Sequence, residues 1–161
     1  MMELLIKRNK TVEIFALEQN RLLLQCSLAD EVHEMNVSLI ADADGFIISA
    51  EAEMKRTPYE ICRSAAGRVQ SLVGLKITDG KQAKNLLHNE QGCEHLSEIV
   101  LDALRAYLPA MGNKVIAALT EQYRSRGLPV ADVQERVRDD LMRLGQGVVT
   151  GRCIVYNSKN K

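Results

Sequence analysis

The stretch that decides the fold is NRLLLQCSLADEVHEMNVSLIADADGFIISAEAEM, residues 20–54. It contains three apolar runs that are separated by short polar segments, and in the middle run Met35, Val37 and Leu39 alternate with polar residues. A period of two is typical of a half-buried strand. Residues 42–45, Asp-Ala-Asp-Gly, have the composition of a tight hairpin turn. Because no helix separates the runs, the stretch predicts an antiparallel meander.

One more apolar run lies before this stretch, so four strands are expected in all. The predicted strands cover residues 11–17, 20–28, 33–42 and 45–54. After residue 56 the apolar spacing changes to that of amphipathic helices. The sequence therefore predicts an α+β fold in which an antiparallel β-meander packs against C-terminal helices.

The first predicted helix starts at a capping box and ends at a glycine. Thr57 is the expected N-cap, Pro58 stands at the first helical position, and Glu60 stands at the third. The helix is expected to run to about Leu72 and to stop at Gly74.

Three further helices are predicted. The second begins near Gly92 and ends at Pro109 and Gly112. Its apolar face consists of Leu96, Ile99, Val100, Ala103, Leu104, Tyr107 and Leu108. The third and fourth are expected at 113–126 and 130–144, and residues 148–161 are a candidate for a last short strand.

Size and composition exclude several classes of protein. The chain has 161 residues and a mass of 18.0 kDa, which predicts a single domain over residues 1–161, with strands within about 3–54, helices within about 57–144 and a short tail. Basic and acidic residues number 21 each and aromatic residues make up 4%, so nucleic acid binding is not expected. No apolar run is long enough to span a membrane. The N-terminus lacks the apolar core of an export signal, so we expect a cytoplasmic protein with reduced thiols.

The strongest local signal is Cys93-Glu94-His95 at the start of the second predicted helix. A helix N-terminus favours the thiolate form of cysteine, which is the form that binds metal or attacks an electrophile. Two residues apart within a helix point in different directions, but at the non-helical N-cap both side chains can turn toward one ion. The alternative is a cysteine that packs as a small apolar residue beside a solvated histidine.

Two other residues lie at the ends of predicted elements, where functional sites are commonly assembled. Cys62 is in the first turns of the first helix, and His33 opens the third strand. Together with Cys93 and His95 they offer two thiols and two imidazoles, a set that suits zinc or an iron–sulfur cluster. Taken singly, Cys62 fits a core position and His33 a solvated strand end, and the spacing matches no zinc-finger pattern.

The remaining cysteines and the third histidine are assigned other roles. Cys26 lies within an apolar run and is predicted to be a core residue, and His88 is predicted to be exposed in a polar loop. Cys153 is left open among a ligand, a reactive thiol and a buried residue.

The order of these pieces resembles a bacterial family of unknown function. The matching pieces are His33, then Glu51 and Glu53, then Pro58-Tyr59-Glu60-Ile61-Cys62, then Leu72-Val73-Gly74-Leu75-Lys76-Ile77, and then Gly92-Cys93-Glu94-His95-Leu96-Ser97-Glu98. The resemblance covers residues 10–108, and a late cysteine such as Cys153 is typical of it. It implies no activity, but it favours a shared role for the four-residue set.

The chain is more distantly similar to the U-type iron–sulfur cluster assembly scaffolds. Those proteins also run from antiparallel strands into helices, and their ligands lie at the places that His33, Cys62 and the Cys93–His95 pair take here. The chain departs from them in three ways: a histidine replaces the first cysteine, Glu34-Met35 replaces the following Gly-Asp, and no proline-rich chaperone-docking segment is present. The similarity implies a scaffold-like fold and a metal locus more than cluster assembly.

Three functions are therefore open. The leading hypothesis is a metal-binding domain, for zinc or an iron–sulfur centre, with His33, Cys62, Cys93 and His95 as ligands and metal or cluster handling as its task. The second is a thiol enzyme or sulfur carrier in which Cys93 or Cys62 is the nucleophile and His95 or His33 is its base. Glu51, Glu53 or Glu94 could orient that base. The third is an interaction module whose helices from 113 to 144 dock a protein partner or a second copy.

Overall fold

The computed structural model describes the backbone of residues 1–149 and the side chains of residues 1–145. The chain divides into two compact units, residues 1–109 and residues 110–161. Each unit is described by itself below.

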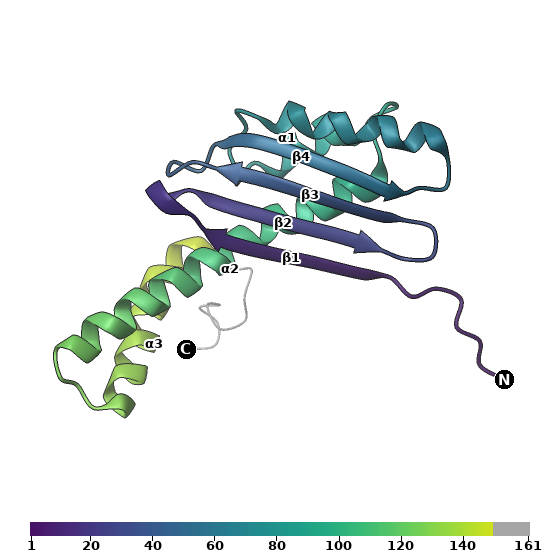
Figure 1. The fold of residues 1–161 in the computed structure, drawn as a ribbon. Coiled ribbons are helices and arrows are strands. Elements are labelled where there is room, and N and C mark those ends of the chain that lie inside the picture. Colours follow the sequence, from purple (N-terminus) through teal and green to yellow (C-terminus); the bar gives the residue numbers. More distant parts are fainter. Residues whose placement is uncertain (150–161) are drawn as a thin grey trace. The chain divides into compact units, whose positions relative to one another are not determined.

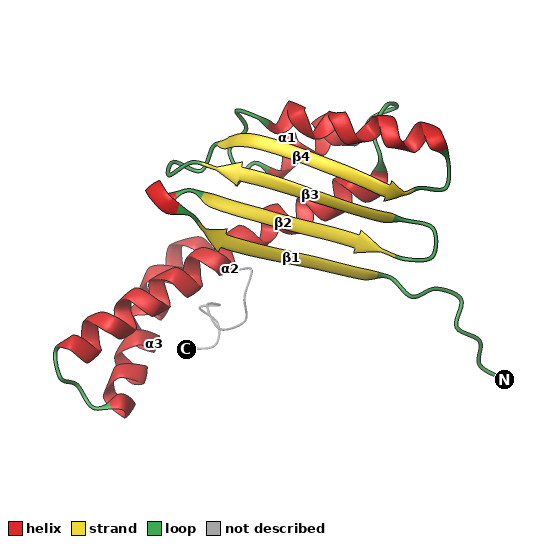
Figure 2. Ribbon diagram, in the orientation of Figure 1, coloured by secondary structure: helices red, strands yellow, loops and turns green. Residues whose placement is uncertain are grey.

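The first unit contains one antiparallel sheet (Figures 1 and 2). Its strands are β1 (Asn9–Ala16), β2 (Leu22–Ala29), β3 (Glu34–Ala41) and β4 (Ile47–Arg56), in the order β1-β2-β3-β4. A short 3-10 turn, η1 (Glu18–Asn20), joins the first two strands. The α+β class and the predicted meander are thus confirmed, with each strand within two residues of its expected start.

The turn between β3 and β4 shows why the hairpin forms at Asp42. The carboxylate of Asp42 accepts the backbone N–H of Asp44 at 3.0 Å and that of Phe46 at 2.8 Å. Gly45 has a φ of +82°, which a residue without a Cβ adopts most easily.

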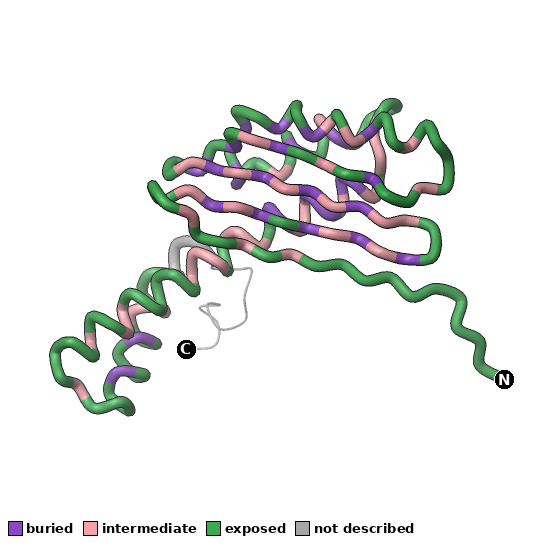
Figure 3. Tube along the Cα trace, in the orientation of Figure 1, coloured by how far each residue is buried: buried purple, intermediate pink, exposed green. Residues whose placement is uncertain are grey.

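Helices cover one face of the sheet, and the other face is open. Along β2 and β3, alternate side chains are buried: Leu22, Leu24, Cys26, Leu28, Met35, Val37, Leu39 and Ala41. The residues between them are half-buried or exposed (Figure 3), as the period of two predicts. The core therefore lies between the sheet and the helices of this unit.

The first predicted helix is η2 (Glu60–Leu72), a 3-10 helix, and the expected capping box is wrong. The N-cap is Tyr59, whose side chain makes no capping bond. The Thr57 hydroxyl donates to the carbonyl of Tyr59 at 3.0 Å, so it is committed to a turn before the helix. The expected stop is confirmed, because Gly74 has a φ of +87° just after the end of η2.

The next helix, α1 (Gly80–Leu87), was not predicted from the sequence. Asp79 is its N-cap and accepts the backbone N–H of Gln82 at 3.0 Å. Only eight residues long, it repeats its apolar face once, in Ala83 and Leu87. This is too short a pattern for period analysis to detect.

The long helix α2 (Glu94–Ser125) begins two residues after Gly92 and continues through Pro109. The predicted end at Pro109 and Gly112, and with it a separate helix at 113–126, is wrong. Proline removes one backbone hydrogen bond and crowds the preceding turn, whereas helical apolar spacing continues on both sides of it. The predicted face is confirmed in its first turns, since Leu96, Ile99, Val100, Ala103 and Leu104 are buried.

The second unit contains the end of α2 and the helix α3 (Val130–Val149), which starts where the fourth helix was predicted. Val133 and Val137 are buried, and the Tyr123 hydroxyl donates to Asp140 at 2.6 Å. The candidate strand at 148–161 falls largely outside the described residues.

Candidate functional site

A buried aspartate shapes the turn from which His33 enters β3. The Oδ1 atom of Asp30 accepts the backbone N–H of Val32 at 2.8 Å and that of His33 at 2.7 Å. The same oxygen lies 3.2 Å from Nδ1 of the His33 ring. One carboxylate therefore holds both the backbone and the side chain of His33.

The other oxygen of Asp30 binds Arg8, which comes from the segment just before β1. Arg8 donates through Nε to Oδ2 at 2.8 Å, and its Nη2 lies 2.7 Å from the same atom. The Asp30 side chain is only 1% exposed. Burial alone would raise the pKa of Asp30, but the backbone N–H groups of Val32 and His33, with Arg8, outweigh it and hold the pKa well below its usual range.

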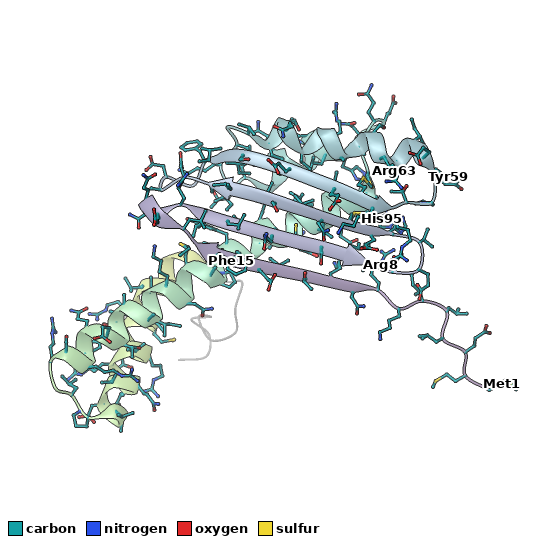
Figure 4. All side chains as sticks on the ribbon, in the orientation of Figure 1. Met1, Arg8, Phe15, Tyr59, Arg63 and His95 are labelled. Atoms are coloured by element: carbon teal, nitrogen blue, oxygen red, sulfur yellow. The ribbon has the colours of Figure 1, made fainter. Side chains whose placement is uncertain are left out.

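His95 meets His33 from the first turn of α2. The two ring centroids are 4.1 Å apart and the rings are tilted by 43°. Nη2 of Arg8 lies 3.4 Å from Nε2 of His95, and Figure 4 shows these two residues at the end of the sheet where β1 begins. Because guanidinium has no acceptor atom, this contact requires Nε2 to be unprotonated, which assigns the ring proton to Nδ1.

His95 is also held toward its neutral form. Partial burial lowers the pKa of His95 most, and the neighbouring His33 and Arg8 lower it further, against the opposing effect of Glu98 and Asp30. A neutral imidazole has one free lone pair, which is the form in which histidine binds a metal or acts as a base.

The loop before α2 fixes where Cys93 and His95 lie. A Cβ on Gly92 would come within 1.9 Å of the Leu87 carbonyl oxygen, so this position accepts only glycine in the present backbone. The Cys93 carbonyl accepts the N–H of Ser97 at 2.9 Å, which makes Cys93 the residue that precedes the helix. His88, exposed as predicted, lies 2.7 Å from the Glu94 carboxylate and joins the loop to the helix.

The three cysteines that the structure describes differ in burial. Cys26 is 3% exposed, which confirms its assignment to the core. Cys62 and Cys93 are free thiols and are partly exposed, and Cys153 lies outside the described residues. Within the described part of the chain, no three or more His, Cys, Asp or Glu side chains are grouped in a way that could hold a metal ion. The structure thus brings His33 and His95 together, and it does not join the two thiols with them into a ready metal site.

Sequence reasoning missed the two residues that orient this histidine pair. The acid beside the His33 imidazole is Asp30, and not Glu51, Glu53 or Glu94 as the thiol-enzyme hypothesis supposed; Glu94 contacts His88 instead. An aspartate three residues before a strand-opening histidine is a local signal that could have indicated Asp30. Arg8 gave no such signal, because its partner is 22 residues away in sequence.

The second unit has a groove of its own, of about 490 Å³, lined mainly by apolar side chains that include Ile116, Val130 and Val137. On α3, which is the fourth predicted helix, the apolar residues Val133 and Val137 are buried, whereas Leu144 is 59% exposed. The interaction-module hypothesis therefore stays a prediction.

The fold and the site define an α+β protein with an antiparallel sheet, helices on one face of it and a paired-histidine cluster at one end. The chain belongs to DUF2889, a family of proteins of unknown function, which matches residues 16–108. This range includes His33, Cys62, Cys93 and His95, whereas Arg8 lies before it. No curated protein and no solved structure matches the chain. The described helices include none that is both long and apolar enough to cross a membrane.

Proposed function

We propose that residues 1–109 form a metal-binding domain in which His33 and His95 supply two imidazole ligands and Cys62 and Cys93 supply two thiolates. The observation that carries this proposal is the contact between the two imidazole rings, whose centroids are 4.1 Å apart. The histidines come from elements far apart in sequence, and both are only partly buried. Two apolar side chains would fill this space at a lower desolvation cost, so the paired imidazoles support a role in ligand binding over one in packing.

The surroundings of His33 support a ligand role. Metal-binding histidines usually donate their second ring N–H to a carboxylate or carbonyl, which fixes the ring and leaves the other nitrogen free. Asp30 lies in this position, 3.2 Å from Nδ1 of His33. Nε2 of His33 is then the atom available to a metal.

His95 needs one change before it can bind. Its Nε2 atom faces Arg8 at 3.4 Å, so the guanidinium must turn aside or His95 must present its other nitrogen. The thiols of Cys62 and Cys93 must also turn toward the imidazoles. Such rearrangement is common, because metal binding is coupled to local folding.

A set of two thiolates and two imidazoles suits tetrahedral zinc or an iron–sulfur centre. Four protein ligands leave no open position, which favours a structural or electron-carrying role, or the handling of the metal or cluster itself, over hydrolysis. With three ligands, exchange or transfer becomes feasible.

The test is metal analysis of protein purified without oxygen, together with its visible absorption spectrum. Bound iron with visible charge-transfer bands would support an iron–sulfur centre, and one zinc per chain in colourless protein would support a zinc site. Cys62→Ser and Cys93→Ser should each remove most of the metal, and His33→Ala or His95→Ala should weaken binding less completely, because water can fill one position. Cys26→Ala and His88→Ala are the matched controls and should keep full occupancy.

Two results would overturn the proposal. Full occupancy in both cysteine variants would show that the metal, if any, is bound elsewhere. Protein without metal that cannot be loaded with zinc or iron, and whose Cys93 thiol reacts rapidly with electrophiles in a manner that depends on His95, would instead support the thiol-enzyme alternative.

A further inference from the structure

The free edge of the sheet lies on β1. In the described part of the chain, β1 pairs with β2 alone, so its outer backbone N–H and C=O groups have no strand beside them. β1 contains no proline or glycine that would interrupt pairing. An edge of this kind is a template for a further strand.

The segment before β1 carries a run of exposed apolar side chains. Leu4, Leu5 and Ile6 are 79%, 84% and 55% exposed. Figure 1 shows this segment running beyond the end of the sheet, and Figure 4 places Met1 at its tip and Phe15 at the opposite end of β1. Phe15 is itself 44% exposed. Apolar side chains at both ends of one edge indicate a partner that covers them together.

We propose that this edge pairs with the same edge of a second copy, so that β1 strands of two protomers run antiparallel about a two-fold axis at Lys10. Antiparallel partners place directly opposed side chains on the same face of a sheet. The helix-covered faces of both copies must lie on the same side of the combined sheet. Odd-numbered residues must therefore oppose odd-numbered residues, and even-numbered residues must oppose even-numbered ones. This holds only when the two-fold axis passes between a residue and the same residue of the second copy.

The register centred on Lys10 is the one that the side chains favour. It sets Leu5 opposite Phe15 of the second copy, and Ile6 opposite Ile14. It also sets Lys7 opposite Glu13, two exposed residues whose side chains make no hydrogen bond or ion pair within the described part of the chain. Moving the axis by one residue keeps this parity but sets Lys7 opposite Thr11 or Phe15, so that the Lys7–Glu13 pair is lost.

The one unfavourable pair of this register is neutralised within each copy. Lys10 opposes itself, but its Nζ atom lies 2.9 Å from Glu98 and 2.6 Å from Asp102. Arg8 reaches Asp30 and the α2 residue His95, so the even-numbered side chains Arg8 and Lys10 share the helix-covered face. Continuing the alternation places Ile6 on that same face, toward Ile14 of the second copy.

Sedimentation at a series of concentrations tests this pairing. The whole chain should form a dimer, and removing residues 2–6 should leave a folded monomer. Glu13→Lys and Lys7→Glu should each raise the dimer dissociation constant at least about tenfold, because both symmetry-related pairs become repulsive. The double variant Lys7→Glu/Glu13→Lys should restore the dimer.

Mixing the two single variants is the sharpest arm of the experiment. Because each opposed pair then combines Glu with Lys, the mixture should form heterodimers although neither variant associates alone. Glu51→Lys, the same charge change on β4, is the control and should leave the dimer intact. A wild-type monomer at all concentrations, a dimer that survives both Glu13→Lys and the deletion, or a mixture that stays monomeric would each overturn the proposal.

Discussion

Arg8 closes an ion pair of 2.7 Å on the buried carboxylate of Asp30. Arg8 lies before the first strand, and Asp30 lies in the turn after the second. The pair thus ties the start of the chain to the turn that presents His33. Among the described residues, Arg8 is the only basic side chain besides His33 that contacts the Asp30 carboxylate.

Replacing Arg8 should therefore destabilise the first unit. Arg8→Ala leaves the Asp30 carboxylate buried without its charged partner, and we expect the free energy of unfolding to fall by about 1–3 kcal/mol. The loss is not larger because the Arg8 side chain is 30% exposed and water partly screens the pair. Urea unfolding followed by circular dichroism measures this. Arg105→Ala removes an exposed pair with Asp102 and should cost less than about 1 kcal/mol. Equal losses in both variants would contradict a special role for the Arg8–Asp30 pair.

Truncating Leu104 tests the packing of α2 in the core. Leu104 is 6% exposed, so Leu104→Ala should lower the free energy of unfolding by about 2–5 kcal/mol. Leu108, one turn further along, is 44% exposed, and Leu108→Ala should cost less than about 1 kcal/mol. A cost below about 0.5 kcal/mol for Leu104→Ala would show that this face is not in the core.

Gly92 should accept no side chain. The added methyl group of Gly92→Ala would collide with the Leu87 carbonyl oxygen, so the loop must move and the first turn of α2 with it. We expect a loss of about 1–3 kcal/mol, with altered NMR shifts for the His95 ring. Gly67 has nothing within 4 Å of an added Cβ, and Gly67→Ala should be tolerated. Unchanged stability and His95 shifts in Gly92→Ala would refute this reading of the loop.

Cys26 should stay unreactive while the protein is folded. Burial raises the pKa of Cys26 to about 12, so almost no thiolate exists at pH 8, and the side chain is also shielded from reagents. Peptide mass spectrometry after brief iodoacetamide treatment should find Cys62 and Cys93 alkylated and Cys26 intact. In denaturant Cys26 should react as well, which provides the control. Early alkylation of Cys26 under native conditions would contradict its core position.

The second unit should lose stability in acid through Asp140. Hydrogen bonds from Tyr123 and from Arg143 lower the pKa of Asp140 below its usual value. A lowered folded-state pKa contributes stability above the unfolded-state value of about 3.9, and this contribution is lost as the pH falls through the folded-state pKa. Tyr123→Phe should therefore make the unfolding free energy less dependent on pH below about 4, as urea titrations at several pH values would measure. Tyr59→Phe, at an exposed position, should leave the pH dependence unchanged.

Local patterns in the sequence determined much of the first unit. Alternating residues such as Met35, Val37 and Leu39 predict a strand because each side chain on one face must leave water. The hairpin at Asp42 and the stop at Gly74 are encoded in a few adjacent residues. Patterns were less informative where a residue that usually ends a helix lies within a longer stretch of helical apolar spacing. Pro109 predicts a helix end, yet α2 continues through it to Ser125.

The candidate site divides in the same way. The sequence by itself indicated His33 and His95 as members of one set, through their positions at the ends of elements. Only the tertiary structure brought their rings within 4.1 Å, and only it placed Asp30 and Arg8 around them. The physical reason is range: strand and turn signals arise from neighbours along the chain, whereas a contact between residues 8, 30, 33 and 95 exists only once the sheet and α2 have packed.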